Sequence, residues 1–386
     1  MGIELMVTFW PFMGMNRSIN WPEYESKGYL AVNLTTGSAC STLVNSSDPE
    51  EDGTCGDNFW RYNTPTNNAL VDSTNPEGMK RTFEHWWNGY GQYGVRAMWM
   101  DESEPDHAKY ISGGQWDLFA GTDAEVLPAW VHYWIKGISD GMNSIGAAAG
   151  EYFILSRNAW AGTWSYGGAL WSGDIGSNWH ELETAVTVGQ GASMSGVALW
   201  TTDIGGYSGG NPDTASFQQM IVRWFQFGAF SPLFRLHGHR GGESAKANPP
   251  TAECAQTNGD NEVWNLAQQS DHYEAIEAVM NLRETLRNYV AKINNDTVMT
   301  GVPMMRPMFI EFPLDEECFN QTVEAQFMLG PDWLIAPVTK ENATSWPAYL
   351  PNIPKITSGT PGETGYEWCY WWNQTVVKGG QWVSVE

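Results

Sequence analysis

The sequence predicts an α/β protein built on an incomplete (β/α)8 barrel of the TIM type, followed by a small β domain. Two observations support this prediction. Short apolar runs alternate with segments of helical pattern, which is typical of a parallel sheet covered by helices. Most of these runs end on a chemically reactive or charged residue, and barrel enzymes build their sites at the carboxyl ends of strands. A length of 386 residues suits one large domain and a smaller one.

We expect six buried strands in the first part of the chain, at residues 5–10, 95–101, 152–157, 169–174, 196–203 and 230–237. The last five end on, or close to, Asp101, Arg157, Asp174, Asp203 and His237. Helices are expected at residues 76–90, 123–142, 180–190 and 214–227. No glycine-rich phosphate loop follows any of these strands, so a doubly wound nucleotide-binding sheet is the weaker interpretation.

A closed barrel of this type needs eight strands. Because only about six strand–helix units can be counted and the first strand begins at Leu5, we expect this chain to be part of a longer one. A long amphipathic helix is expected at residues 262–294, followed by short strands at 304–312, 325–338, 346–350 and 367–385. We place the boundary near Gly301, with a partial barrel at residues 1–301 and a C-terminal domain at residues 302–386.

Composition narrows the range of partners. The net charge is −24, from 20 Lys and Arg against 44 Asp and Glu, and such a chain should repel nucleic acids and anionic membranes. No apolar run reaches the length of a membrane span. The 22 tryptophans suit a sugar-binding cleft, because flat rings cover the apolar faces of pyranoses, although most of them should fill the core. The sequence gives no indication of oligomeric state.

Cysteines and glycosylation patterns bear on the cellular location. The five cysteines include no C-x-x-C pair, which makes a thiolate zinc site improbable, and Cys40 and Cys55 could form a disulfide within one polar loop. N-glycosylation patterns occur at Asn16, Asn33, Asn45, Asn295, Asn320, Asn342 and Asn373. These features favour the secretory pathway or the extracellular space, without a signal peptide in this chain, and accidental patterns are the alternative.

Two expected strands carry a tryptophan and deliver an aspartate. Asp101 lies in Trp-Met-Asp-Glu-Ser-Glu-Pro at residues 99–105, and Asp174 lies in Leu-Trp-Ser-Gly-Asp at residues 170–174. Cleavage of a glycoside needs one carboxylate to attack or stabilise the anomeric carbon and a second carboxyl group to protonate the leaving oxygen. Burial and a neighbouring negative charge would keep the second group protonated. Either aspartate alone could instead be a helix cap.

These motifs resemble those of family 31 of the α-glycoside hydrolases. Residues 99–105 match Trp-x-Asp-x-x-Glu-Pro, and residues 171–174 match Trp-(Ser/Thr/Gly)-Gly-Asp. Residues 200–207 match Trp-x-x-Asp-Ile-Gly-Gly-(Phe/Tyr), and residues 235–238 match Arg-x-His-Gly. Arg157 matches the arginine after strand five, while residues 303–313 and 326–331 match the join to a C-terminal β-sandwich. The matches follow one another in order over nearly the whole chain.

The resemblance implies a role for each matched position. Asp101 would be the nucleophile and Asp174 the general acid/base. The residues expected to bind sugar hydroxyls in the first subsite are Arg157, Asp203 and His237. Those expected to wall that subsite are Trp99, Trp171, Tyr207 and, in the loop before Asn75, Trp60. The family's N-terminal β-sandwich and its first two barrel strands have no counterpart in this chain.

The sequence therefore predicts a retaining, exo-acting α-glycoside hydrolase of the α-glucosidase or α-xylosidase type. Its partner would be an α-linked oligosaccharide or glycoside, and it would need no cofactor. Residues 99–106 look closer to the bacterial α-xylosidase-like branch of the family, while an α-glucosidase fits the sequence equally well. The alternatives are a carbohydrate-binding pseudoenzyme, an inactive fragment of such an enzyme, or an α-transglycosylase that uses the same two aspartates.

Two further patterns have simpler interpretations. His237 and His239 form an H-x-H pair of the kind that binds zinc, but no third ligand is evident, so no metal is expected. His237 could also be a satisfied core histidine. Glu102 and Glu104 could support the site residues from behind, but a solvated turn is the favoured interpretation.

Overall fold

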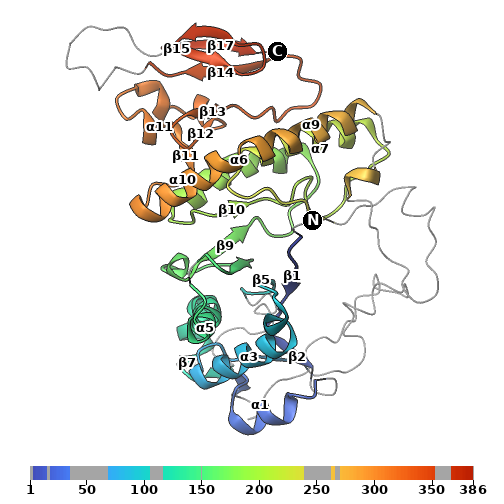
Figure 1. The fold of residues 1–386 in the computed structure, drawn as a ribbon, viewed down its shortest axis with the longest axis vertical. Coiled ribbons are helices and arrows are strands. Elements are labelled where there is room, and N and C mark those ends of the chain that lie inside the picture. Colours follow the sequence, from blue (N-terminus) through green and yellow to red (C-terminus); the bar gives the residue numbers. More distant parts are fainter. Residues whose placement is uncertain are drawn as a thin grey trace. The chain divides into compact units, whose positions relative to one another are not determined.

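The computed structural model describes residues 3–14, 18–34, 68–104, 116–148, 150–238, 262–265, 270–352 and 367–385. The chain packs as two compact units (Figure 1). The first unit comprises Met1–Trp171 and Pro249–Thr257, and the second comprises Ser172–Asn248 and Asn258–Glu386. Each unit is described by itself below.

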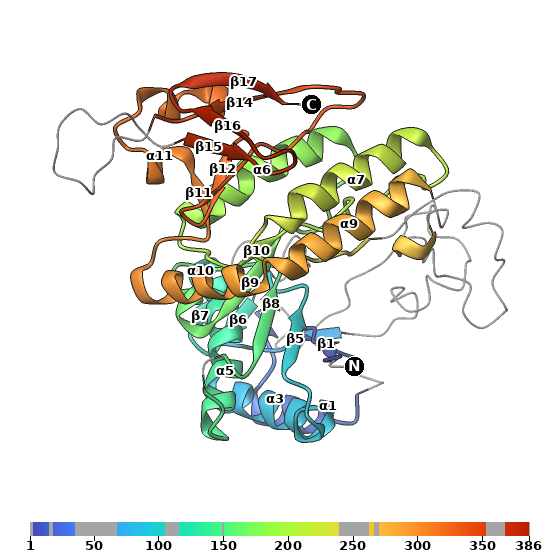
Figure 2. The same cartoon turned by 45° about the horizontal axis from the view of Figure 1, so that its top comes forward.

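A parallel sheet forms the centre of the first unit. Its strands, in spatial order, are β1 (Met6–Thr8), β5 (Ala97–Met100), β8 (Phe153–Ser156) and β9 (Gly168–Trp171). Figure 2 shows β1, β5 and β8 side by side. In the register, Met98 lies opposite both Val7 and Ile154. All four strands lie within runs expected from the sequence or overlap them, and their parallel pairing confirms the barrel-type arrangement.

The two helices predicted for this unit begin at the expected residues, Pro76 and Asp123, whereas α1 (Trp21–Lys27) was not predicted. Helix α3 (Pro76–Gly89) starts at Asn75, whose Oδ1 accepts hydrogen bonds from the backbone N–H groups of Glu77 and Gly78, at 3.1 Å each. The helix expected at residues 123–142 is divided instead into α4 (Asp123–Val126), the 3₁₀ turn η3 (Leu127–Ala129) and α5 (Trp130–Ser144). Pro128 accounts for the division, because it has no N–H to continue the helical ladder.

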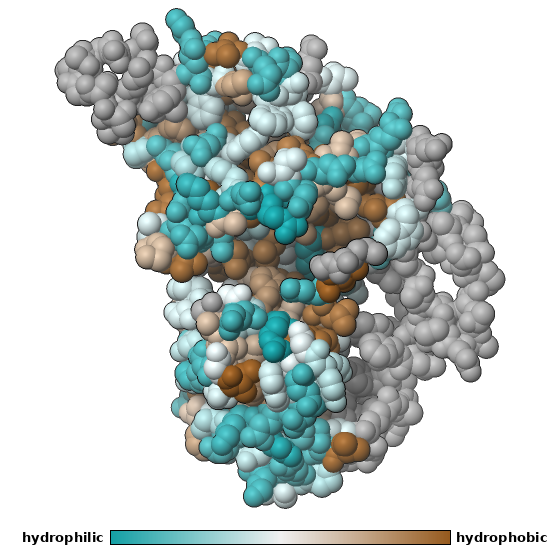
Figure 3. Space-filling model, in the orientation of Figure 1, coloured by the Kyte–Doolittle hydropathy of each residue, from teal (hydrophilic) through white to brown (hydrophobic). Residues whose placement is uncertain are grey.

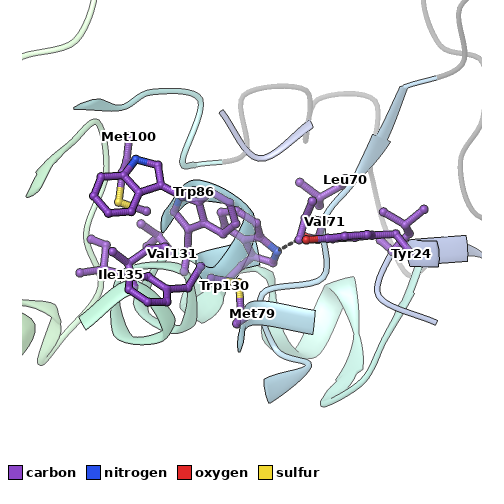
Figure 4. Close-up of a cluster of buried hydrophobic side chains, with 14 of the residues drawn as sticks. Tyr24, Leu70, Val71, Met79, Trp86, Met100, Trp130, Val131 and Ile135 are labelled. Atoms are coloured by element: carbon purple, nitrogen blue, oxygen red, sulfur yellow. Dashed lines mark hydrogen bonds between the residues drawn. The ribbon is translucent and has the colours of Figure 1, made fainter. Parts of the chain in front are cut away.

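Helices α3 and α5 enclose the core of the first unit, and Figure 4 shows part of it. Trp130 is fully buried, and its Nε1 donates to the backbone oxygen of Val71 at 3.2 Å, the dashed line in Figure 4. The ring of Trp130 stacks on that of Trp134, with centroids 5.3 Å apart. A Cβ at Gly141 of α5 would lie 2.2 Å from the Phe83 ring of α3, so only glycine permits this close packing. Tryptophan does fill this core, as expected.

Smaller elements surround this core. They are β2 (Phe12–Gly14), α1 (Trp21–Lys27), β3 (Val32–Asn33), β4 (Asn68–Leu70), η1 (Gly91–Tyr93), β6 (Trp116–Leu118), β7 (Gly121–Thr122) and η4 (Thr163–Tyr166). Strand β2 pairs with β4, and β3, β6 and β7 form a three-stranded antiparallel sheet.

The second unit opens with helices around a short strand. These elements are α6 (Trp179–Met194), β10 (Trp200–Thr201) and α7 (Ala215–Ala229). The prediction of a strand at residues 230–237 is wrong, because among the described residues this segment makes a single parallel bridge, between Leu236 and Ile204. The N–H groups of Phe230 and Ser231 close the end of α7 by binding the oxygens of Phe227 and Gly228, and the next residue, a proline, has no N–H.

The long helix expected at residues 262–294 is also shorter at its start and divided. The structure has the 3₁₀ turn η5 (Val263–Asn265), then α9 (Asp271–Thr285), capped by Ser270, and α10 (Arg287–Thr300). Within α10, Asn295 is exposed, whereas Thr297 is only 6% exposed. The Thr297 hydroxyl donates to the backbone oxygen of Ile293 at 2.9 Å.

The final segment is mostly strands, as expected. Strands β11 (Met305–Pro307), β12 (Phe327–Leu329) and β13 (Trp333–Ile335) form one antiparallel sheet. Strand β14 (Trp346–Leu350) pairs with β17 (Gln381–Val385), and β15 (Glu367–Tyr370) pairs with β16 (Thr375–Lys378). Helix α11 (Met308–Glu311) replaces the second half of the strand expected at residues 304–312, and the turns η6 (Glu316–Phe319) and η7 (Gln321–Val323) follow it. The domain boundary near residue 301 stays a prediction.

Polar residues predominate on the face of the described surface that Figure 3 shows. In Figure 3 most of the coloured residues in view are teal or white, and brown apolar residues form scattered patches. Among the residues that the structure describes, no helix is both long and apolar enough to cross a membrane.

Candidate active site

Asp101 follows the last residue of β5 and is 7% exposed. Its Oδ1 accepts the backbone N–H of Glu102 at 2.9 Å and lies 3.4 Å from Nη1 of Arg157. Glu102 has φ 56°, a left-handed conformation that is rare for any residue other than glycine, asparagine or aspartate. Such strain is found mainly where a turn must hold a functional side chain in place. The geometry thus fixes one oxygen of a buried carboxylate at the carboxyl end of a parallel strand.

Arg157 follows β8 and is surrounded by carboxylates from the loop after β5. Its Nε lies 2.7 Å from Oε1 of Glu104, and its Nη1 lies 3.9 Å from Oε1 of Glu102. The side chains of Glu102 and Glu104 are 12% and 28% exposed. The expected solvated turn is therefore wrong. Charges that leave water need partners of opposite sign, and the guanidinium of Arg157 supplies one for this turn.

A ring of hydrogen bonds ties the loop after β5 to the loop after β8. The backbone N–H of Asn158 donates to Oγ of Ser103 at 3.1 Å, and the two hydroxyls of Ser103 and Ser156 lie 2.9 Å apart. The Ser156 hydroxyl donates to the backbone oxygen of Asn158 at 2.8 Å, which closes the ring. Both serines are fully buried. Since Asp101 and Arg157 lie in these two loops, the ring sets their relative position.

Trp99 and Trp171 lie near the ends of their strands in the same unit. Trp99 is in β5 and Trp171 ends β9, and their ring centroids are 6.0 Å apart with an interplanar angle of 63°. Trp171 is 4% exposed, and Trp99 is half-buried. The structure thus brings the two tryptophans expected to wall the first subsite into contact.

In the second unit, Asp203 follows β10 and is completely buried. Its carboxylate forms an ion pair with the guanidinium of Arg235, and its backbone N–H donates to Oγ of Ser172 at 3.3 Å. We did not predict a role for Arg235, although it opens the Arg-x-His-Gly motif that we matched. A buried carboxylate needs a partner of opposite charge. The arginine in the matched Arg-x-His-Gly motif was the sequence feature from which this ion pair could have been predicted.

Tyr207 and His237 come together in the same unit. Their rings stack with centroids 5.4 Å apart and an interplanar angle of 27°. His237 is partly exposed rather than buried in the core. The backbone N–H of Tyr207 donates to the oxygen of Ile175 at 2.7 Å, so the loop after β10 lies against the loop that carries Asp174. At Gly206 (φ 76°) a Cβ would lie 2.5 Å from the backbone oxygen of Gly176, so this contact requires glycine.

Asp174 lies in that loop and is exposed. Its own unit does not provide the burial that we expected to keep its carboxyl group protonated. Asp101, Arg157, Trp99 and Trp171 belong to the first unit, whereas Asp174, Asp203, Tyr207 and His237 belong to the second. The catalytic pairing of Asp101 with Asp174 stays a prediction. Trp60, Cys40 and Cys55 lie outside the described residues.

No group of three or more His, Cys, Asp or Glu side chains within the described ranges could hold a metal ion.

The sequence matches two family models that follow one another along the chain. The glycosyl hydrolases family 31 TIM-barrel domain matches residues 1–293, and the glycosyl hydrolase family 31 C-terminal domain matches residues 301–386. The chain belongs to glycosyl hydrolase family 31. The family resemblance and the fold class expected from the sequence are thereby confirmed.

Several relatives of this family 31 chain are α-xylosidases. Alpha-xylosidase A of Aspergillus niger is 27% identical over 417 residues, which cover 100% of this chain and 51% of the relative. The alpha-xylosidase of Saccharolobus solfataricus is 26% identical over 390 residues and is covered to 44%. The crystal structure of a GH31 alpha-xylosidase from a soil metagenome, complexed with xylose, superposes with a TM-score of 0.82 at 31% identity, over 100% of this chain and 51% of that one. The chain spans about half the length of the curated relatives it matches.

Proposed function

We propose that this chain carries the catalytic site of a retaining, exo-acting α-glycoside hydrolase. The observation that best supports the proposal is Asp101, a buried carboxylate at the carboxyl end of β5. Both of its polar contacts with described residues engage Oδ1, from Glu102 and Arg157, which leaves Oδ2 as the attacking atom. Membership of family 31 and the names of the relatives support a glycosidase.

In the first step, Oδ2 of Asp101 attacks the anomeric carbon of an α-linked sugar at a nonreducing end. A β-linked glycosyl-enzyme forms as the glycosidic bond breaks, and Asp174 gives its proton to the leaving oxygen. In the second step, Asp174 removes a proton from water, and the water oxygen attacks the anomeric carbon from the α face. The α-sugar leaves, and Asp101 regains its carboxylate.

The remaining site residues position the sugar. Arg157, Asp203 and His237 supply hydrogen bonds to its hydroxyls. Arg157 is itself held by Glu104, and Asp203 by Arg235, so both groups are fixed before the sugar arrives. The aromatic side chains proposed to wall the first subsite are those of Trp99, Trp171, Tyr207 and Trp60.

The relatives favour an α-xyloside as the substrate, and an α-glucoside is the alternative. Two of the relatives named above are called α-xylosidases, and neutral alpha-glucosidase AB of Homo sapiens is 26% identical over 317 residues. The nitrophenyl α-xyloside and α-glucoside should separate these, since the two sugars differ only by a hydroxymethyl group. The glycoside with the higher kcat/KM identifies the sugar that the pocket accepts.

The decisive experiment measures hydrolysis and the anomer released first. Two proteins are assayed on nitrophenyl α-glycosides: the 386-residue chain and the product of the longest open reading frame that encodes it. Proton NMR should show the α-sugar before mutarotation, and Asp101→Ala should abolish turnover. The matched control is Asp140→Ala, an exposed aspartate on α5 that contacts only the solvent-facing Lys136 among described residues. Release of the β-sugar would contradict retention, and binding without turnover in both forms would identify a carbohydrate-binding pseudoenzyme.

We also propose that the protein enters the secretory pathway. Two of the glycosylation patterns, at Asn320 and Asn342, place an exposed asparagine in a turn or loop outside the C-terminal hairpin, which suits an acceptor site. Protein from its native source should lose mass on treatment with an N-glycanase. An unchanged mass at both peptides would contradict this location.

A further inference from the structure

The hairpin of β15 and β16 has a tightly held tip. Residues 371–374 connect the two strands, and the backbone N–H of Gln374 donates to the oxygen of Tyr370 at 2.8 Å. The side chain of Gln374 donates to the oxygen of Trp371 at 2.6 Å, and the N–H of Thr375 donates to Oδ1 of Asn373 at 3.0 Å. Gln374 has φ 61°, as a tight turn requires. The backbone of the tip is therefore fixed by its own hydrogen bonds.

This tip presents two tryptophans to solvent. Trp371 is 48% exposed and Trp372 is 61% exposed. Burying such a ring contributes about 2–3 kcal/mol or more, so two exposed rings forgo a large stabilisation. The ring of Trp371 also contacts that of Trp333 in β13, with centroids 4.9 Å apart, and Trp333 contacts Phe230 at 5.8 Å. Trp371 is thus anchored in the body of the unit, and its position does not depend on a ligand.

We propose that the hairpin tip, defined by Trp371, Trp372 and Asn373, is a second carbohydrate-binding site that binds the pyranose rings of a neutral polysaccharide. The site is other than the one that contains Asp101. It goes beyond the proposed function, because it would bind sugar whether or not Asp101 is a catalytic residue.

The chemistry of the tip matches a sugar better than other partners. A pyranose has an apolar face, which a flat indole covers, and a rim of hydroxyls, which amides and hydroxyls bind. Asn373, Gln374 and Thr375 supply amide and hydroxyl groups beside the indoles, and all three residues are exposed. Nucleic acids and anionic membranes are disfavoured by the net charge of −24. The pre-formed tip lowers the entropic cost of binding a flexible chain.

Affinity electrophoresis tests the proposal on the full 386-residue chain, produced in bacteria so that Asn373 carries no glycan. Native gels contain soluble dextran, soluble starch or xyloglucan, and the wild-type chain should be retarded by at least one of them. Trp372→Ala should weaken the apparent affinity about five- to tenfold, the effect of removing one stacked ring. Trp372→Phe keeps a flat ring and should retain most of the retardation.

A matched control and two readouts keep the outcome interpretable. Trp264→Ala removes a tryptophan of equal exposure, 62%, from η5 and should leave the retardation unchanged. Thermal melting of each variant separates lost binding from lost folding, which matters most for Trp371→Ala because of its contact with Trp333. Hydrolysis of a nitrophenyl α-glycoside by Trp372→Ala should equal that of the wild type, so this site and the proposed active site can fail separately.

Three outcomes would overturn the proposal. The first is no retardation of the folded wild-type chain in any of the three polysaccharides. The second is equal retardation of the wild type and Trp372→Ala. The third is a change in sedimentation, with Trp372→Ala breaking a self-associated form while polysaccharide binding stays the same, which would assign the tip to contact between copies.

Discussion

Oε1 of Glu104 lies 2.7 Å from Nε of Arg157, while Nη1 of the same guanidinium lies 3.4 Å from Oδ1 of Asp101. Arg157 thus connects Asp101, the proposed nucleophile, with Glu104, which does not contact the substrate in our proposal. Glu104 is a positioning residue, because it acts by holding Arg157 in place. The guanidinium group is planar and rigid, so a contact at Nε also fixes the orientation of the two Nη atoms. Glu104 thereby holds Nη1 of Arg157 in position beside Asp101.

Glu104→Gln should lower kcat/KM for an α-glycoside by about tenfold, because a neutral amide binds the guanidinium less strongly than a carboxylate does. The loss should fall mainly on KM, since Arg157 is proposed to bind a sugar hydroxyl. Steady-state kinetics measure this split. Glu84→Gln is the matched control, since Glu84 contacts Arg81 at 2.9 Å on the surface of α3. Equal losses in both variants would remove the special role of Glu104.

The two aspartates should respond differently to substitution. Asp101→Ala should reduce hydrolysis of every substrate to near background, because no glycosyl-enzyme forms. Asp174→Ala removes the proton donor, so substrates with poor leaving groups should suffer most. A dinitrophenyl glycoside or a glycosyl fluoride needs little protonation, and its first step should largely survive. Pre-steady-state kinetics on good and poor leaving groups measure the difference.

Azide should identify each aspartate by the anomer that it produces. In Asp174→Ala, azide attacks the β-linked intermediate and should give the α-glycosyl azide. In Asp101→Ala, azide attacks the α-linked substrate itself and should give the β-glycosyl azide. The products are separated and identified by NMR. If the two anomers are exchanged, the roles of Asp101 and Asp174 are reversed. If neither variant forms a glycosyl azide, the proposed roles are contradicted.

The serine ring should contribute to stability. Ser103→Ala leaves the N–H of Asn158 and the hydroxyl of Ser156 without one of their buried partners, which should cost about 1–3 kcal/mol of unfolding free energy. Urea unfolding measures the loss. The double variant Ser103→Ala/Ser156→Ala should cost less than the sum of the single ones, because both belong to one network. Ser26→Ala, on the surface of α1, is the control. Strict additivity would show that the two hydroxyls act independently.

The buried ion pair of the second unit should behave as a unit. Arg235→Gln takes the guanidinium from a fully buried carboxylate, and a loss of about 3–5 kcal/mol is expected. Asp203→Asn in the same chain should recover part of that loss, since the buried group is then neutral. Thermal and urea unfolding of the single and double variants measure the coupling. A double variant less stable than Arg235→Gln alone would contradict this expectation.

The two described cysteines should differ in reactivity. Burial raises the pKa of the Cys318 thiol to about 12, so at pH 8 almost none of it is thiolate. Cys369 is exposed on β15. Brief treatment with iodoacetamide at pH 8, followed by peptide mapping, should label Cys369 and spare Cys318. The same treatment in guanidinium chloride should label both, because unfolding returns the Cys318 pKa to its ordinary range. Labelling of Cys318 in the folded chain would contradict its burial.

The carboxyl-end pattern of the sequence predicted the main feature of the site. Asp101 and Arg157 were expected after neighbouring parallel strands, and they do lie in contact, because side chains after paired parallel strands emerge at one edge. The same reasoning could not find Ser103 or Ser156. Serine has no sequence pattern that distinguishes a buried cross-strand hydrogen bond from an ordinary turn, and the bond depends on the register of β5 against β8.

The failed elements have local causes that a hydrophobic pattern does not weigh. Pro128 divides an amphipathic helix, and the strand expected at residues 230–237 loses its first N–H groups to the end of α7. Glu104 was placed in solvent because carboxylates usually lie there, yet Arg157 draws it into the structure. Both kinds of error concern which partner a polar group finds, which is decided by tertiary contacts.

The glycosylation pattern at Asn295 has a consequence for the order of events during synthesis. The pattern requires the threonine two positions on, and in the finished helix α10 the hydroxyl of Thr297 is buried and bonded to Ile293. An enzyme that attaches a glycan must reach both residues in an extended segment, so modification at Asn295 has to precede the folding of α10. Asn320 and Asn342 lie in an exposed bend and an exposed turn, so they can be modified after folding. The fraction of chains with a glycan at Asn295 would therefore report the rate of glycan transfer relative to the rate at which helix α10 folds.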